Sequence, residues 1–187
     1  MIRSFIGNFV QDICNHNGYS EEQCEQIQYT TTVLFFEFIK LMSIIIIFSL
    51  IGYCKESIII IGIMSITKPF IGGYHENTQI KCFIATMLIT TSVILLSLNC
   101  KLNFISNCIL ILISLFSIYN TAPVLNDKMP ITRLELIKRN RILGIIISSI
   151  VSTSSILLYK YSELYELITW TILFQSILMF NKIEKIK

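Results

Sequence analysis

The chain has 187 residues, of which 53% are hydrophobic and only 14% charged, with a mean hydropathy of +0.69. A soluble domain usually carries about 25% charged residues, so the composition excludes an ordinary soluble domain and indicates an integral membrane protein. The net charge of +3 is small. Its basic residues gather in a few loops, which excludes the basic face of a nucleic-acid-binding module.

The pattern predicts an all-α membrane protein that forms a single domain, residues 1–187. Within it we distinguish an N-terminal region (1–32), a helical bundle (33–180) and a basic tail (181–187). No cofactor is implied by any motif.

Residues 2–13 carry an apolar stripe at helical spacing but are too few to span a bilayer. We expect an amphipathic helix that lies in the membrane interface or packs against the bundle. It should end near 16–18, and Ser20 with Gln23 has the form of a capping box that starts a second helix.

The bundle region contains about six apolar helical segments of near-spanning length. We place them at residues 33–51, 57–71, 83–98, 104–119, 142–158 and 164–180. The second is the shortest, and residues 132–141, just before the fifth, are expected to be helical. In the first segment, Glu37 and Lys40 are spaced to pair near a helix end.

Basic residues distribute unevenly between the turns. Lys55, Lys101 and Lys160 stand alone in theirs, whereas residues 68–81 carry two, residues 120–141 carry five and the tail carries three. By the positive-inside rule the richer set is cytoplasmic, together with both termini. The six cysteines are scattered without a C-x-x-C motif, and we interpret them as small hydrophobes rather than a disulfide framework.

The polar stretch 68–82 interrupts the apolar runs and carries the candidate chemistry. His75-Glu76 begins the H-E-x-x-H zinc motif, but Gln79 replaces the second histidine, so no metal site is expected. What remains is Cys82 with His75, a thiol and an imidazole that can activate it as a nucleophile.

Geometry restricts how this pair works. Seven residues along a straight helix separate two side chains by roughly 10 Å, whereas proton transfer needs about 3 Å. Gly72-Gly73 supplies the freedom for a loop that returns His75 over a helix starting near Asn77. Cys82 would then lie in the first turns of that helix, where the helix dipole favours a thiolate.

The pattern Lys68-x3-Gly72-Gly73-x-His75-x6-Cys82, with the loop Ala122-Pro123-x6-Pro130, resembles the accessory gene regulator B (AgrB) family of bacterial membrane cysteine endopeptidases. Lys68 stands where that family usually has arginine, which keeps the charge but loses the bidentate fork. The order of apolar segments is similar over nearly the whole chain.

The resemblance implies a thiol protease that removes the acidic tail of an AgrD-like propeptide and cyclises the remainder to a thiolactone or lactone. Such autoinducing peptides serve quorum sensing and virulence regulation. Cys82 would be the nucleophile and His75 the general base, in a bacterial cell membrane with the active site facing the cytoplasm. A homodimer is left open.

Supporting roles are assigned to Lys68, Gly72 and Gly73, as substrate contacts or as amide donors to an oxyanion. Lys138, Arg139 and Arg141 either bind the acidic tail or only fix topology. The alternative function is a non-proteolytic permease or exporter component in which His75 and Cys82 are structural. A thiol-redox enzyme is third, disfavoured by the missing C-x-x-C.

Overall fold

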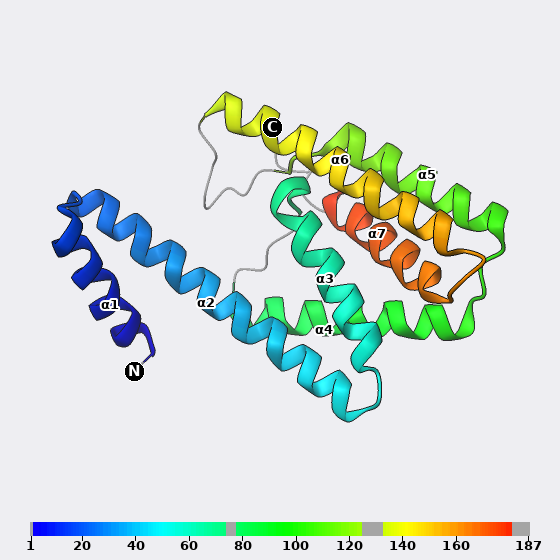
Figure 1. Cartoon of the computed structure of the whole chain (residues 1–187), viewed down its shortest axis with the longest axis horizontal. Coiled ribbons are helices and arrows are strands. Elements are labelled where there is room, and N and C mark those ends of the chain that lie inside the picture. The colour runs from blue at the N-terminus through cyan, green and yellow to red at the C-terminus, as the bar shows by residue number, and fades with distance from the viewer. Residues whose placement is uncertain (1, 74–77, 125–132, 181–187) are drawn as a thin grey trace. The chain divides into compact units, whose positions relative to one another are not determined.

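The structure is a computed structural model that describes residues 2–73, 78–124 and 133–180. Within these ranges the chain forms seven α-helices and no β-strand, which confirms the all-α prediction (Figure 1). The chain divides into two compact units, Met1–Ile46 and Ile47–Lys187, and each is described by itself.

The first unit contains helix α1 (Ile2–Asn17) and most of helix α2 (Glu21–Leu50). The capping box is confirmed: the Ser20 amide donates to Gln23 Oε1 at 3.0 Å, and the Gln23 amide donates to Ser20 Oγ at 3.3 Å. Gly18 precedes it with a φ of 65°, a conformation that glycine adopts without steric cost. Glu37 and Lys40 form the expected ion pair.

Helix α1 packs on the start of α2. Ile6, Val10 and Cys14 form a small core with Cys24 and Ile27. Cys14 and Cys24 form a disulfide, with Cα atoms 5.9 Å apart, so the expectation that the cysteines serve only as small hydrophobes is wrong for this pair. The linear spacing of ten residues gave no sign of it, because the proximity arises only when the hairpin folds.

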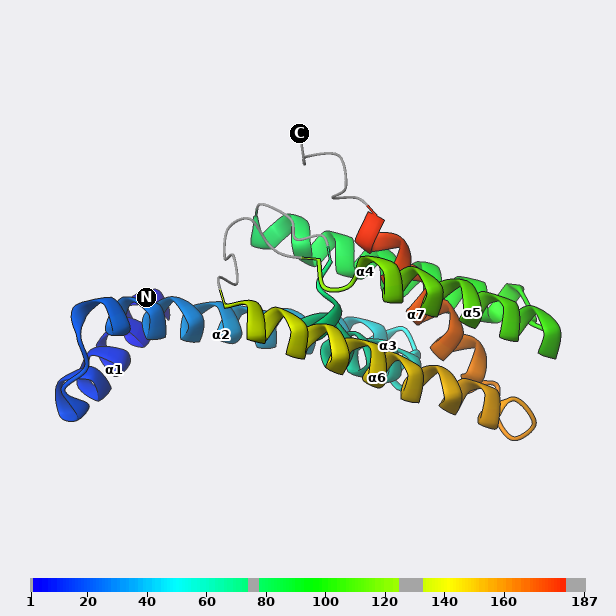
Figure 2. The same ribbon diagram turned by 90° about the horizontal axis from the view of Figure 1, so that it is seen from above.

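The second unit contains the remaining helices: α3 (Cys54–Ile71), α4 (Gln79–Asn99), α5 (Phe104–Thr121), α6 (Leu134–Leu158) and α7 (Leu164–Phe180). Helix α7 contacts each of the other four, and Figures 1 and 2 both place it among them. Ten of its 17 residues are buried, so it forms the centre of this unit.

Four helices are long and apolar enough to cross a membrane, namely α2, α4, α5 and α6. Helix α7 is apolar but has 17 residues, and α3 carries Lys55, Glu56 and Lys68 within its 18. The expectation of about six spanning segments therefore holds for four of them and stays a prediction for α3 and α7. The expected helix 132–141 and segment 142–158 are one continuous helix, α6.

Two contacts show which turns share an end of the second unit. At one end, Val124 pairs with Gly72; we name this the bridge end. At the other, Lys101 forms an ion pair with Glu163; we name this the Lys101 end. Two of the basic-rich stretches, 68–81 and 120–141, thus meet at one end, as the alternation predicted, whereas the basic tail lies outside the described residues. Which end faces the cytoplasm stays a prediction.

Polar contacts join α5, α6 and α7 in the interior. Thr169 donates to Asn107 Oδ1 at 2.6 Å, and the hydroxyls of Ser155 and Thr169 lie 2.7 Å apart. Asn107 also donates to Ser155 Oγ at 3.4 Å. All three side chains are buried, so they satisfy one another where water is absent.

Candidate functional site

Cys82 occupies the first turn of α4, as the sequence predicted. The helix begins at Gln79 with Thr78 as N-cap, whose hydroxyl accepts the Lys81 amide at 3.3 Å. The Cys82 amide donates to the Thr78 carbonyl at 3.0 Å, which starts the helical ladder. Its thiol is half-buried and is not part of a disulfide.

His75 lies outside the described residues, as do its neighbours 74–77. Its pairing with Cys82 therefore stays a prediction. The described residues that flank this stretch are Gly73 before it and Thr78 after it. We refer to the contacts next to these flanking residues as its anchors.

The anchor before the segment is Gly72, which is bridged to Val124 in parallel. The Val124 amide donates to the Ile71 carbonyl at 3.0 Å. A Cβ on Gly72 would lie 2.2 Å from the Val124 carbonyl oxygen and 2.9 Å from its nitrogen. Only glycine allows this approach, and its φ of 74° with ψ of −155° is likewise a region essentially restricted to glycine.

This bridge joins the two motifs that the sequence analysis singled out. The first contains Gly72, and the second contains Ala122-Pro123, whose peptide bond is cis. They lie about fifty positions apart in the sequence, yet their backbones pair. Sequence spacing alone gave no register for this contact.

The proposed oxyanion donors differ in what surrounds them. The Gly72 amide donates to the Lys68 carbonyl at 3.0 Å as the C-terminal cap of α3, so an oxyanion role for it requires that bond to break. Gly73 is buried, has a φ of 139°, and has no atom of the described residues within 4 Å of the position its Cβ would take. Gly72 and Gly73 thus both adopt positive φ values, which glycine reaches without steric cost.

Lys68 lies in the last turn of α3, which continues through Pro69 to Ile71. Two contacts hold this turn, and sequence reasoning missed both. Thr67, fully buried, donates to Gln175 Oε1 of α7 at 2.7 Å. Gly144 of α6 lies so close that a Cβ there would be 3.0 Å from Ile71 Cγ2.

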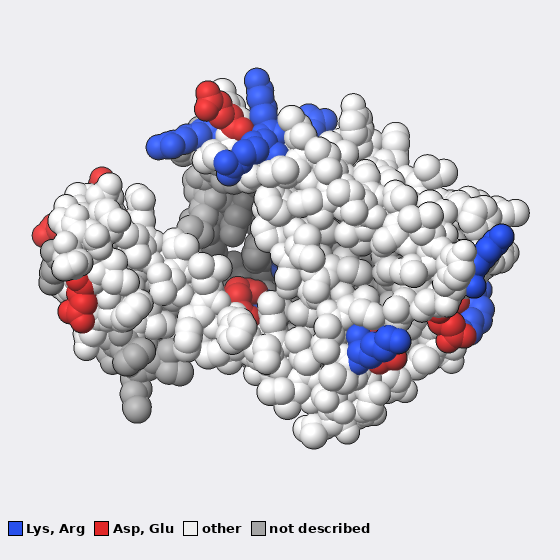
Figure 3. Space-filling view, in the orientation of Figure 1, with Lys and Arg blue, Asp and Glu red and all other residues white. Residues whose placement is uncertain are grey.

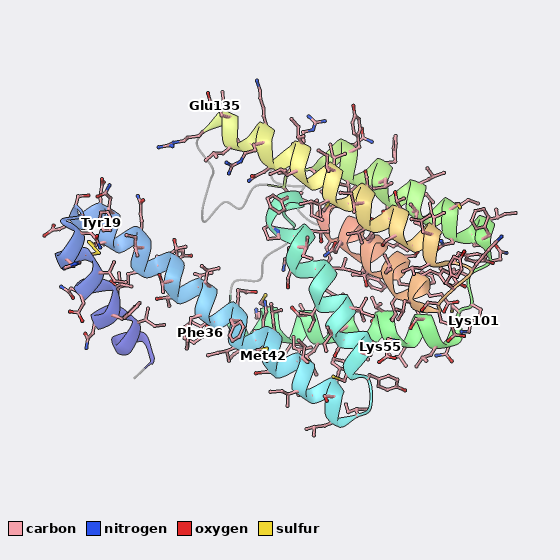
Figure 4. All side chains as sticks on the ribbon, in the orientation of Figure 1. Tyr19, Phe36, Met42, Lys55, Lys101 and Glu135 are labelled. Carbon is pink, nitrogen blue, oxygen red and sulfur yellow. A yellow bond between two sulfur atoms is a disulfide. The ribbon has the colours of Figure 1, made fainter. Side chains whose placement is uncertain are left out.

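Three basic residues that follow the second motif in the chain lie on the first turns of α6. Lys138, Arg139 and Arg141 are exposed. Figure 3 shows basic side chains gathered over this end of α6, where Figure 4 labels Glu135. Arg141 differs from the other two because it contacts Tyr119. Its guanidinium donates to the Tyr119 backbone carbonyl at 3.2 Å, and the guanidinium carbon lies 5.7 Å from the centre of the Tyr119 ring. Arg141 therefore caps the end of α5.

Among the described residues, no group of three or more His, Cys, Asp or Glu side chains could hold a metal ion. The described residues place a thiol, Cys82, in the first turn of α4. Before it in the chain, Gly72 ends α3, pairs with Val124 after the end of α5, and follows Ile71, which packs against Gly144 of α6. Such a frame suits covalent chemistry by a side-chain nucleophile.

Comparison with known proteins agrees with the motifs. The sequence model of the accessory gene regulator B family, AgrB, matches residues 6–179. An AgrB-like protein of Clostridium perfringens (strain 13, type A) is 47% identical over 184 residues, which cover 98% of this chain and 98% of that protein. No solved structure matches the chain. The match spans both helical units and both motifs, and on this evidence the chain belongs to the AgrB family.

Proposed function

We propose that this protein is a membrane-embedded cysteine endopeptidase that cleaves an AgrD-type propeptide and closes the remaining peptide into a thiolactone or lactone. One observation carries the proposal. The Gly72–Val124 bridge joins the two family motifs, and the segment that follows leads directly into the helix whose first turn holds Cys82.

The reaction assigned to these residues is acyl transfer in two steps. The Cys82 thiol gives its proton to His75, and the sulfur attacks the scissile carbonyl. The C–N bond breaks, the amine of the acidic tail takes the proton from His75, and the peptide is held as a thioester. The substrate's own thiol or hydroxyl then attacks this thioester. Its proton returns through His75 to the Cys82 sulfur, and the ring is released.

The frame around Gly72 supports this assignment because a dyad needs hydrogen-bond distances within a few tenths of an ångström. Helix α3 is fixed at its C-terminal end by α6 at Gly144 and by α7 at Gln175. The segment that contains His75 therefore follows a packed helix end and precedes Thr78, the exposed N-cap of α4. We assign Gly73, the described residue that directly precedes this segment, as the place where the substrate backbone approaches.

The test uses the full-length protein in lipid nanodiscs with a synthetic propeptide. Cys82→Ala and His75→Ala should each abolish cleavage, and wild-type protein quenched in acid should carry the peptide as a thioester detectable by mass spectrometry. Cys108→Ala is the matched control, since Cys108 is also a half-buried thiol, on α5, and is not part of the proposed site.

Cleavage that persists in Cys82→Ala would refute the nucleophile. If the protein in sealed lipid vesicles instead moved intact peptide across the bilayer, and both variants kept that activity, the permease alternative would replace the proposal. Loss of cleavage in the Cys108 variant as well would mean that the substitutions act through folding.

A further inference from the structure

A cavity of about 310 Å³ lies at the Lys101 end of the second unit, at the opposite end of the helices from the Gly72–Val124 bridge. Its charged lining comes from the first turn of α3 (Lys55 and Glu56), from the α4–α5 turn (Lys101), and from the end of the α6–α7 turn and the start of α7 (Glu163 and Glu166). Figure 4 labels Lys55 and Lys101 at this end, and Figure 3 shows basic and acidic side chains there side by side. The volume is within the range of small-ligand sites.

Glu166 is the buried member of this set, with 1% of its side chain exposed. Its Oε1 accepts the Leu102 amide at 3.2 Å and the Tyr165 hydroxyl at 2.9 Å. Its Oε2 has only the Lys101 ammonium, at 3.8 Å, among the described residues. That distance is too long for a hydrogen bond. One oxygen of a buried carboxylate therefore still has capacity for a donor.

Lys101 does not fill that position because it is directed to Glu163. Its Nζ lies 3.0 Å from Glu163 Oε1, and this hydrogen bond raises the pKa of Lys101, so the ammonium is charged at neutral pH. The cavity thus offers an open carboxylate oxygen on Glu166 and, from Lys55 and Lys101, positive charge for an anionic group. A ligand that carries an ammonium and an anion together fits both.

We propose that this cavity binds the ammonium–phosphate headgroup of an aminophospholipid such as phosphatidylethanolamine. The primary ammonium donates to Glu166 Oε2, and the phosphate lies near Lys55 and Lys101. The occupant is a lipid because the cavity lies at the ends of apolar helices, which is where headgroups lie in a bilayer. The partly exposed Leu98 and Leu164 in its lining provide apolar contact for the glycerol and upper acyl chains.

The proposal also ranks headgroups. The lining carries more carboxylates than ammonium groups, which disfavours headgroups that are only anionic, such as phosphatidylglycerol. A choline headgroup has the right charges but no N–H, so it cannot complete Glu166. Charge-assisted hydrogen bonds are about twice as strong as neutral ones, and we expect about tenfold tighter binding of the ethanolamine than of the choline lipid.

The first experiment changes only the ligand. Delipidated wild-type protein in detergent is titrated, with native mass spectrometry as readout, against lipids of one acyl composition whose amine carries zero to three methyl groups. Affinity should fall along the series, with the largest loss at the third methyl. Equal affinity for all four lipids would overturn the proposal. Soluble phosphoethanolamine is a separate arm: affinity equal to that of the lipid would assign the site to a free zwitterion instead.

The second experiment changes the protein. Glu166→Gln should reduce the tenfold preference for ethanolamine to within about twofold. Lys160→Gln is the matched control because Lys160 is exposed on the same α6–α7 turn but does not line the cavity. A tenfold preference retained in Glu166→Gln would refute the assignment. Should that variant fail to fold, as judged by circular dichroism, the methylation series on wild-type protein decides alone.

Discussion

Substitution of Gly72 by alanine tests whether the backbone bridge controls the reaction. The new Cβ would lie 2.2 Å from the Val124 carbonyl oxygen and 2.9 Å from the Val124 nitrogen, so the two loops must separate. Separation breaks the hydrogen bond from the Val124 amide to the Ile71 carbonyl, a net loss of about 1 kcal/mol. The backbone conformation adds strain, because alanine at a φ of 74° and ψ of −155° costs about 1–3 kcal/mol.

Together these terms disfavour the bridged arrangement by about 2–4 kcal/mol. A change of 1.36 kcal/mol is a factor of about ten in an equilibrium, so the bridged population falls steeply relative to open forms. We expect kcat/KM for propeptide cleavage to fall at least about tenfold, since only the bridged form fixes the start of the 73–78 segment. The assay is propeptide cleavage in nanodiscs, with the thermal unfolding midpoint measured in parallel.

Gly18→Ala is the matched control for strain. Gly18 also has a positive φ, 65°, but no atom of the described residues lies within 4 Å of its Cβ position. The variant therefore introduces backbone strain without a steric clash. Its activity should stay within about twofold of wild type. Val124→Ala is the second control, because the three atoms nearest to the Cβ position of Gly72 all belong to the Val124 backbone. Unchanged kcat/KM in Gly72→Ala, with the variant folded, would refute a role for the bridge in catalysis.

Three further predictions follow from side chains outside the bridge. Replacing Lys138 and Arg139 together by glutamine should raise KM for an acidic-tailed propeptide and leave kcat intact, since uniform binding is lost; an unchanged KM would make them topology determinants only. Arg141→Gln should instead lower the unfolding midpoint by a few degrees through loss of its cap on α5; a midpoint equal to wild type would contradict the cap. Replacing Cys14 and Cys24 together by serine should make the α1–α2 hairpin less stable than the disulfide-bonded wild type by about 3 kcal/mol, the loop-closure value for their spacing. Hydrogen exchange measures this difference, and equal protection of the hairpin amides in both proteins would refute it.

Local signals in the sequence predicted the helices well. The last segment, 164–180, is α7 without change, and the capping box at Ser20 forms as expected. These features depend on neighbours within one turn, so the sequence contains all the information they need. The helix expected at 132–141 is confirmed from Leu134 onward, and the structure adds that it continues without a break into the apolar segment 142–158.

In the candidate site, the sequence likewise predicted the features that depend on neighbouring residues and not the contacts between distant ones. The place of Cys82 in the first turn of a helix follows from the start of an apolar run, and the structure agrees. The bridge from Gly72 to Val124 and the hydrogen bond from Thr67 to Gln175 join positions far apart in sequence. Their register is set by how the helices pack, which no local pattern specifies.

One signal for that packing was nevertheless present, in the polar residues rather than the apolar ones. In a bilayer, apolar side chains face lipid as readily as the interior, whereas small and polar residues mark the faces where helices meet. On α6 the buried residues are Gly144, Ser148, Ser152 and Ser155, spaced by one helical turn each. The buried residues of α4 repeat the same period and include Thr86, Thr90 and Ser97. Exposed isoleucines and leucines, such as Ile146 and Ile150, occupy the outer face of α6. The spacing of serines, threonines and glycines therefore indicates the inward face of a spanning helix in this protein. Gly144 belongs to that series and packs against Phe70 and Ile71 at the end of α3, next to Gly72.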